Sequence, residues 1–136
     1  MSTHSIVSTR HVEGDFLRLA LTADAATTGT MGLAFVVASP LLDSWLGLPA
    51  AVLIVTGAVL AAYASLVLRL ATRPAMPRAA VVAVIAANAL WAVDTLVLLA
   101  LDGFSPSTAG QIVIAVQAVG SAAFAALQSV GLRRAA

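Results

Sequence analysis

Four long stretches of the chain consist almost wholly of apolar residues, and short polar segments separate them. They cover residues 16–39, 48–71, 79–101 and 108–132. As helices rising about 1.5 Å per residue, all four can cross a hydrocarbon core of about 30 Å. The pattern therefore predicts an all-α, polytopic membrane protein in which four transmembrane helices form a bundle.

Proline and polar residues mark the predicted connections. Pro40 ends the first span, because proline cannot continue the backbone hydrogen-bond ladder. Residues 41–47 form a connection in which Trp45 is interpreted as an interfacial anchor. Pro49 opens the second span at an early helical position that proline tolerates. Residues 1–15 are a polar tail, and residues 16–134 form the transmembrane domain.

Composition supports the membrane class and excludes several kinds of chemistry. Hydrophobic residues make up 61% of the chain and charged residues 10%, whereas a soluble domain has about 25% charged residues. There is no cysteine, so disulfides and thiolate metal sites are excluded. His4 and His11 lie in the tail, where they neither activate a serine within a span nor ligate haem there. We therefore expect no enzyme activity, no metal and no cofactor.

The arginines indicate how the chain is oriented. If all four spans are real, every arginine falls on one side of the membrane, and the opposite connections carry only Asp43 and Asp102. This positive-inside pattern predicts that both termini are cytoplasmic. Because this topology accounts for the arginines, we expect no nucleic acid as a binding partner. Abundant alanine and the absence of lysine indicate a high-GC bacterium, so we expect the protein in the bacterial cytoplasmic (inner) membrane. The arginines are Arg10, Arg18, Arg69, Arg73, Arg78, Arg133 and Arg134.

An alternative makes the first span a cleaved signal peptide, since Val36 and Ala38 have the small-residue spacing of a cleavage site. Asp24 and the neighbouring threonines make a poor signal-peptide core, so we favour a retained span.

The two predicted hairpins resemble each other. Residues 61–66 match residues 122–127, and in the preceding spans Asp24 occupies a place like that of Asn88. Both hairpins start on the same side, so the repeat is parallel, with its axis along the membrane normal. The repeat predicts that Asp24 and Asn88 face each other near that axis.

Asp24 is the polar residue that most suggests chemistry. A carboxyl inside a span is costly and persists where it is compensated or used. The functional interpretation makes Asp24 a proton or cation site. The structural interpretation, which we favour, has Asp24 paired with Arg18 or hydrogen-bonded to Thr28 or Asn88.

Other polar residues within the spans extend this candidate site. Asn88, Trp91 and Asp94 fall within a sector of about 120° on one helix. Asp94 is interpreted either as half of a carboxylate pathway with Asp24 or as a group that reaches interfacial water. Small residues in span two, Gly57, Ala61 and Ser65, allow close helix packing. The candidate polar interior or coupling site comprises Asp24, Thr28, Asn88, Trp91, Asp94, Gln117 and Gln128.

Several short motifs, in order along almost the whole chain, carry a resemblance to a known group of proteins. They are Leu-Arg-Leu at 17–19 followed by Asp24, Ala-Thr-Arg-Pro at 71–74, Ala-Ala-Asn-Ala-Leu-Trp at 86–91, and Leu-Arg-Arg at 132–134. The chain resembles a family of small, uncharacterised four-span integral membrane proteins of actinobacteria and other high-GC bacteria. The resemblance implies a fold and a location and no chemistry.

Two functions remain open. The first is a structural or accessory subunit that packs against other membrane helices, in a homo-oligomer or a larger membrane complex. The second is a small proton-coupled transporter of an organic or cationic solute using Asp24, which resembles the small multidrug resistance proteins in Asp24, Tyr63 and Trp91. Two features count against this resemblance. Those proteins use Glu at the key position, where this chain has Asp24. Their dual-topology members have balanced loop charges, whereas the arginines here predict one orientation. A membrane enzyme is a third class, but the sequence shows no evident catalytic set for it. Among these functions we favour the accessory subunit.

Overall fold

Four long helices dominate the computed structural model, which describes residues 11–12, 14–101 and 106–135. They are α2 (Asp15–Val37), α4 (Ala50–Ala71), α5 (Arg78–Leu101) and α6 (Thr108–Ala135). All four are long and apolar enough to cross a membrane. Their ends differ by at most three residues from the ranges 16–39, 48–71, 79–101 and 108–132. The predicted fold class is confirmed: the chain is an all-α, multi-pass membrane protein.

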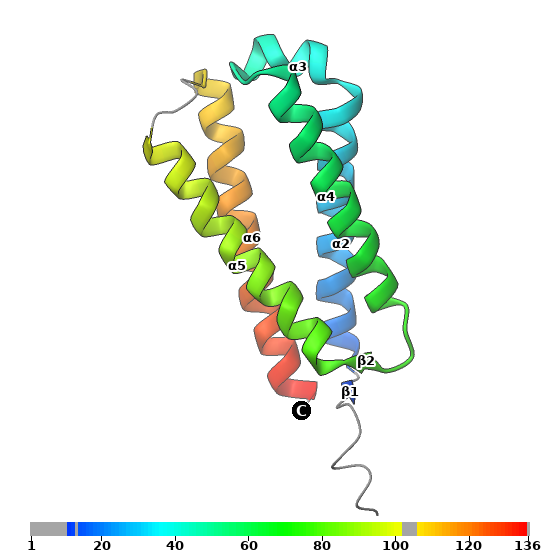
Figure 1. Cartoon of the computed structure of the whole chain (residues 1–136). Coiled ribbons are helices and arrows are strands. Elements are labelled where there is room, and N and C mark those ends of the chain that lie inside the picture. The colour runs from blue at the N-terminus through cyan, green and yellow to red at the C-terminus, as the bar shows by residue number, and fades with distance from the viewer. Residues whose placement is uncertain (1–10, 13, 102–105, 136) are drawn as a thin grey trace, which may run out of the picture.

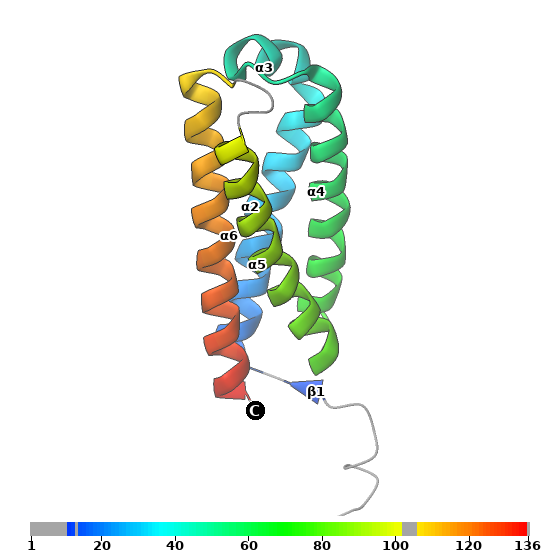
Figure 2. The same ribbon diagram turned by 60° about the vertical axis from the view of Figure 1, so that its left-hand side comes forward.

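The helices pack as two hairpins (Figure 1). Helices α2 and α4 contact each other extensively, as do α5 and α6. The hairpins join mainly through α2 and α6, whereas α4 and α5 make few contacts. Figure 2 shows α5 running in front of the bundle between α6 and α4. One side of the bundle is therefore closed by α2 and α6, and the α4–α5 side is only loosely packed.

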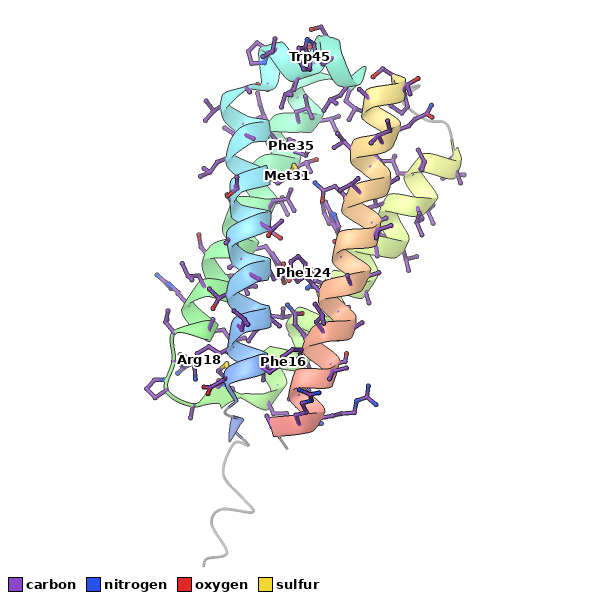
Figure 3. The ribbon with its side chains drawn as sticks, turned by 180° about the vertical axis from the view of Figure 1, so that it is seen from behind. Phe16, Arg18, Met31, Phe35, Trp45 and Phe124 are labelled. Atoms are coloured by element: carbon purple, nitrogen blue, oxygen red, sulfur yellow. The ribbon has the colours of Figure 1, made fainter. Side chains whose placement is uncertain are left out.

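A short helix, α3 (Ser39–Leu46), replaces the predicted connection at residues 41–47. Pro40 occupies its first turn, where the missing N–H has no helical partner to lose. Gly47 then ends α3 with φ 67°, a left-handed conformation that glycine adopts without strain. Trp45 lies exposed on α3 at one end of the molecule (Figure 3), and its role as an interfacial anchor stays a prediction.

A pair of two-residue strands was also not predicted. Strand β1 (His11–Val12) lies within the segment interpreted as a tail and pairs antiparallel with β2 (Met76–Pro77). The pairing holds the segment before α2 against the connection between α4 and α5. Met76 is fully buried there.

The arginines that the structure describes gather at one end. Arg18 lies in the first turn of α2, Arg69 in the last turn of α4 and Arg78 at the start of α5, while Arg133 and Arg134 lie in the last turn of α6. Asp43 lies on α3 at the opposite end, and Figure 3 shows Arg18 and Trp45 at these two ends. Arg10 and Asp102 fall outside the described residues. Which end faces the cytoplasm stays a prediction from the positive-inside pattern.

Two clusters of apolar side chains form the core. The cluster at the arginine end includes Leu17, Leu21, Val67, Met76, Val81 and Leu132. The cluster at the α3 end comprises Phe35, Leu46, Leu48, Leu53 and Leu60. Tyr63 packs against the first cluster and Trp91 against the second.

Candidate functional site

A fully buried carboxylate, Asp24 of α2, is the centre of the candidate site. It accepts four side-chain hydrogen bonds. Thr28 Oγ1 donates to Asp24 Oδ1 over 2.9 Å. Asp24 Oδ2 accepts from Tyr63 OH at 2.9 Å, and from Asn88 Nδ2 and Gln128 Nε2 at 2.8 Å each. We call these five residues the Asp24 cluster.

The Asp24 cluster takes at least one member from each long helix. Thr28 is on α2 with Asp24, Tyr63 on α4, Asn88 on α5 and Gln128 on α6. Each helix has one terminal residue at the arginine end: Asp15 in α2, Ala71 in α4, Arg78 in α5 and Ala135 in α6. Counted from these residues along each helix, Asp24 is nine residues away, Tyr63 eight, Asn88 ten and Gln128 seven. At about 1.5 Å per residue these side chains share one depth, about 10 to 15 Å from that end. One carboxylate thus fastens all four helices at one level.

A further hydrogen bond joins two of the residues that donate to Asp24. Asn88 Nδ2 also lies 3.0 Å from Gln128 Oε1 and donates to it. Within the described part of the chain, no buried side-chain nitrogen or oxygen lacks a hydrogen-bond partner. A buried carboxylate in a bundle of apolar helices is stabilised when its lone pairs meet such donors. The geometry therefore compensates Asp24 without a basic residue.

Arg18 does not pair with Asp24, which corrects one of the sequence-based alternatives. Its guanidinium instead donates to the backbone carbonyls of Ala71, Arg73 and Pro74, with distances of 2.7 Å to Arg73 O and 3.2 Å to Pro74 O. The carbonyls at the end of a helix lack helical donors and carry the negative end of its dipole, so a cation there is favourable. Arg18 thus caps α4 and ties its end to the start of α2.

Tyr63 is the member of the Asp24 cluster that was not among the predicted site residues. In the proposed hairpin repeat Tyr63 matches Phe124, so the hydroxyl is the chemical difference between the two positions. That hydroxyl is the group that donates to Asp24. The repeat alignment was the signal that could have singled it out. The repeat also predicted that Asp24 and Asn88 face each other, and the structure places them in direct hydrogen-bond contact.

A second polar pair lies further from the arginine end. Trp91 Nε1 donates to Gln117 Oε1 over 3.4 Å, which links α5 to α6. Thr95 is buried one turn later and donates to the backbone oxygen of Trp91. Trp91 and Gln117, both predicted site residues, therefore form a pair of their own and are separate from the Asp24 cluster.

Asp94 lines the same two cavities as Trp91 and Gln117, but no hydrogen bond between the described residues joins it to either group. It is exposed on α5, whereas Asn88 on the same helix is buried. Six residues separate them, which turns Asp94 about 120° away from the direction of Asn88. The sector predicted from the sequence therefore has two different edges. The edge at Asn88 faces Asp24, and the edge at Asp94 faces out of the bundle.

A cleft runs along the loosely packed side between α4 and α5. It consists of three cavities, of about 160, 250 and 460 Å³ from the α3 end to the arginine end. The first two share Trp91, Asp94 and Gln117 as lining residues, and the last two share Tyr63 and Ala87. We call this row of cavities the α4–α5 cleft. Its walls include the exposed apolar side chains Val59, Leu66 and Leu90, so it opens to the outside of the bundle.

The described residues offer no grouping of metal ligands. Among residues 11–12, 14–101 and 106–135, no three His, Cys, Asp or Glu side chains could hold an ion together. What the arrangement can do is fasten helices through the Asp24 cluster and accommodate an apolar group in the α4–α5 cleft.

Comparisons with known proteins returned no match to a family model, to a curated protein or to a solved structure. The resemblance to a family of small four-span membrane proteins therefore stays a prediction.

Proposed function

We propose that this chain is a structural or accessory subunit of a membrane complex, and that the α4–α5 cleft receives a helix of another membrane protein. The bacterial cytoplasmic membrane, with both termini inside, is the location that the arginine pattern favours. The observation that carries the proposal is the division of roles among the polar residues. The Asp24 cluster uses its polar atoms to hold this chain together, while the cleft leaves apolar side chains uncovered.

The Asp24 cluster supports a structural role because its carboxylate already has donors from all four long helices. Inter-helix hydrogen bonds of this kind each contribute about 0.6 to 2 kcal/mol in a bundle. A coupling carboxylate must instead exchange its proton or cation partner during each cycle, which requires these bonds to break. The saturated geometry therefore favours a rigid scaffold.

The α4–α5 cleft supports the accessory role because of its length and lining. On α5 its lining residues run from Ala80 to Leu98, eighteen residues along the helix. At about 1.5 Å per residue this is about 27 Å, close to the hydrocarbon thickness of a bilayer. Ala80, Ala83 and Ala87 line the α5 side, and small residues at such spacing let a neighbouring helix approach closely. A lengthwise groove of this kind matches a transmembrane helix.

Gentle extraction from the native membrane followed by native mass spectrometry tests the proposal. The expected spectrum contains this chain with a second membrane protein in fixed stoichiometry. A matched variant, Ala83→Phe, fills the cleft and should release the partner, whereas Ala123→Phe, on an exposed part of α6, should not. A lone monomer from the wild-type chain under the gentlest extraction would contradict the proposal.

One observation favours the small proton-coupled transporter as a second candidate. Tyr63 and Asn88 both donate to Asp24 and both line the middle cavity of the cleft. A proton arriving in that cavity can reach Asp24 through the Tyr63 hydroxyl, which accepts it while passing its own proton to the carboxylate. Under this candidate, Asp24→Asn should abolish proton-coupled flux of a cationic solute in proteoliposomes while the protein stays folded. Undiminished coupled flux in that variant would eliminate Asp24 as the coupling site.

A further inference from the structure

Asp94 is a carboxylate in the α4–α5 cleft that faces outward. It is exposed and lines two cavities of the cleft: the one nearest α3, which we call the outer cavity, and the middle one. Seven residues separate it from Leu101 at the end of α5, so it lies about 10 Å inside that end of the helix. A carboxylate at that depth, on a surface that faces lipid, is costly unless a cation accompanies it.

Among the residues that the structure describes, no cation lies at the depth of Asp94. The sequence holds no lysine, and no arginine lies between Arg18 and Arg69 or between Arg78 and Arg133. The arginines that the structure describes lie toward the opposite end of the bundle. A second copy packed in the same orientation would therefore bring its arginines to the wrong level. A cation paired with Asp94 would therefore come from a different molecule.

The surroundings of Asp94 favour a helix as the carrier of that charge. Apart from Asp94, the outer cavity is lined mainly by apolar side chains, together with Thr56, Trp91, Thr95 and Gln117. The cleft continues from there toward Arg69 and Arg73 at the other end. A small cation would fill one cavity, whereas a helix covers the whole length and can carry a basic side chain at one depth. Charged residues within membranes are commonly paired in this way across helices.

We propose that the α4–α5 cleft binds a transmembrane helix of a different protein that carries one arginine or lysine at the depth of Asp94. The Asp94 carboxylate pairs with that side chain, and the remaining contacts are apolar. This inference rests on the proposed accessory function and names the chemistry of the partner. It separates Asp94, which recognises the partner, from Asp24, which holds the subunit together.

A synthetic peptide can test this without knowing the partner. The probe is a 24-residue leucine–alanine helix, of about transmembrane length, with one arginine at the depth of Asp94; a control peptide has glutamine there. The full chain, labelled at Ser44→Cys, is reconstituted in phosphatidylcholine–phosphatidylglycerol vesicles, and energy transfer to the labelled peptide measures binding. The arginine peptide should bind tighter than the glutamine peptide, by a factor on the order of ten.

Two variants decide what causes the preference. Asp94→Asn should reduce it to about one, and the matched control Asp43→Asn, on α3 outside the spans, should leave it unchanged. Equal binding of the two peptides to the wild-type chain would overturn the inference, as would a preference that survives Asp94→Asn. So would Asp94-dependent binding of tetraphenylphosphonium with no binding of either peptide, because it would make the occupant a small cation.

Failure of this inference can be told from failure of the accessory function. If native mass spectrometry finds a stoichiometric partner and Asp94→Asn does not weaken that complex, the accessory role stands and the ion pair is wrong. If no partner is found but the arginine peptide binds in an Asp94-dependent way, the cleft recognises a basic helix and the stable complex is wrong.

Discussion

The two oxygens of Asp24 have unequal surroundings. Oδ1 accepts from Thr28 alone, whereas Oδ2 accepts from Tyr63, Asn88 and Gln128. An asparagine can copy this arrangement, with its oxygen toward the three donors and its amide donating to the Thr28 hydroxyl. A leucine cannot, because it removes the acceptor that the four donors share; of the four, Asn88 keeps its second hydrogen bond to Gln128 Oε1.

This asymmetry gives a stability prediction. Asp24→Asn should cost at most about 2 kcal/mol, while Asp24→Leu should cost more, because each buried polar group left unpaired costs about 1 to 3 kcal/mol. The free energy of unfolding, measured by denaturant titration in mixed micelles, gives both values. Equal stability of the leucine variant and the wild-type chain would mean that the Asp24 cluster does not hold the bundle.

Tyr63 provides a second test at the scale of one atom. Tyr63→Phe removes the hydroxyl that donates to Asp24 and should cost about 0.6 to 2 kcal/mol. Ser65→Ala is the matched control on α4, because that exposed hydroxyl bonds only the carbonyl of Ala61 in its own helix. The same unfolding titration should find the control unchanged. Equal losses in the two variants would remove Tyr63 from the Asp24 cluster.

Part of this residue-level geometry was predictable. The repeat predicted that Asp24 lies opposite Asn88, and Gln128 was among the predicted residues of the polar interior. Tyr63 was missed because an aromatic residue in an apolar helix is far more often packing. Asp94 was grouped with the interior because helical periodicity gives a sector, and the packing of neighbouring helices decides which edge of the sector is buried.

At the scale of elements, α2 and α4 are held together by a close crossing of two glycines. A Cβ atom added to Gly32 would lie 2.7 Å from the backbone oxygen of Gly57, and one added to Gly57 would lie 2.5 Å from the oxygen of Gly32. Neither backbone can yield without separating the helices. Gly57 was predicted as part of a packing ridge, whereas Ser65 of the same ridge is exposed.

Gly57→Ala should therefore destabilise the bundle by about 1 to 3 kcal/mol, the usual cost of overpacking. Gly120→Ala is the matched control, because a Cβ there meets nothing within 4 Å. It should be neutral or stabilising by up to about 1 kcal/mol through helix propensity. Thermal unfolding followed by circular dichroism ranks the two. A stable Gly57→Ala protein would contradict the close crossing.

The long helices were predicted to within a few residues because hydrophobic length fixes them. Helix α3 and the β1–β2 pair were not predicted. Eight residues are too few for periodicity to separate a helix from an apolar connection. The pairing of His11–Val12 with Met76–Pro77 joins segments more than sixty residues apart, and no local pattern encodes it.

At the scale of the molecule, the charge distribution predicts a single orientation. The chain has no cysteine, so single substitutions can report which side a residue faces. Ser44→Cys on α3 should react with a membrane-impermeant maleimide added to whole cells. Thr72→Cys, at the arginine end of α4, should react only after the cells are opened. Labelling of both from outside would refute the positive-inside assignment.

Photo-crosslinking in the living membrane tests whether a helix of another protein occupies the α4–α5 cleft. Leu66 lines the cleft, and Leu19 on α2 does not; their side chains are 65% and 66% exposed, and both lie near the arginine end. A photoreactive residue at position 66 should yield one discrete protein adduct, while the same residue at position 19 should yield mainly lipid adducts. Lipid adducts alone at both positions would mean that no helix of another protein lies in the cleft.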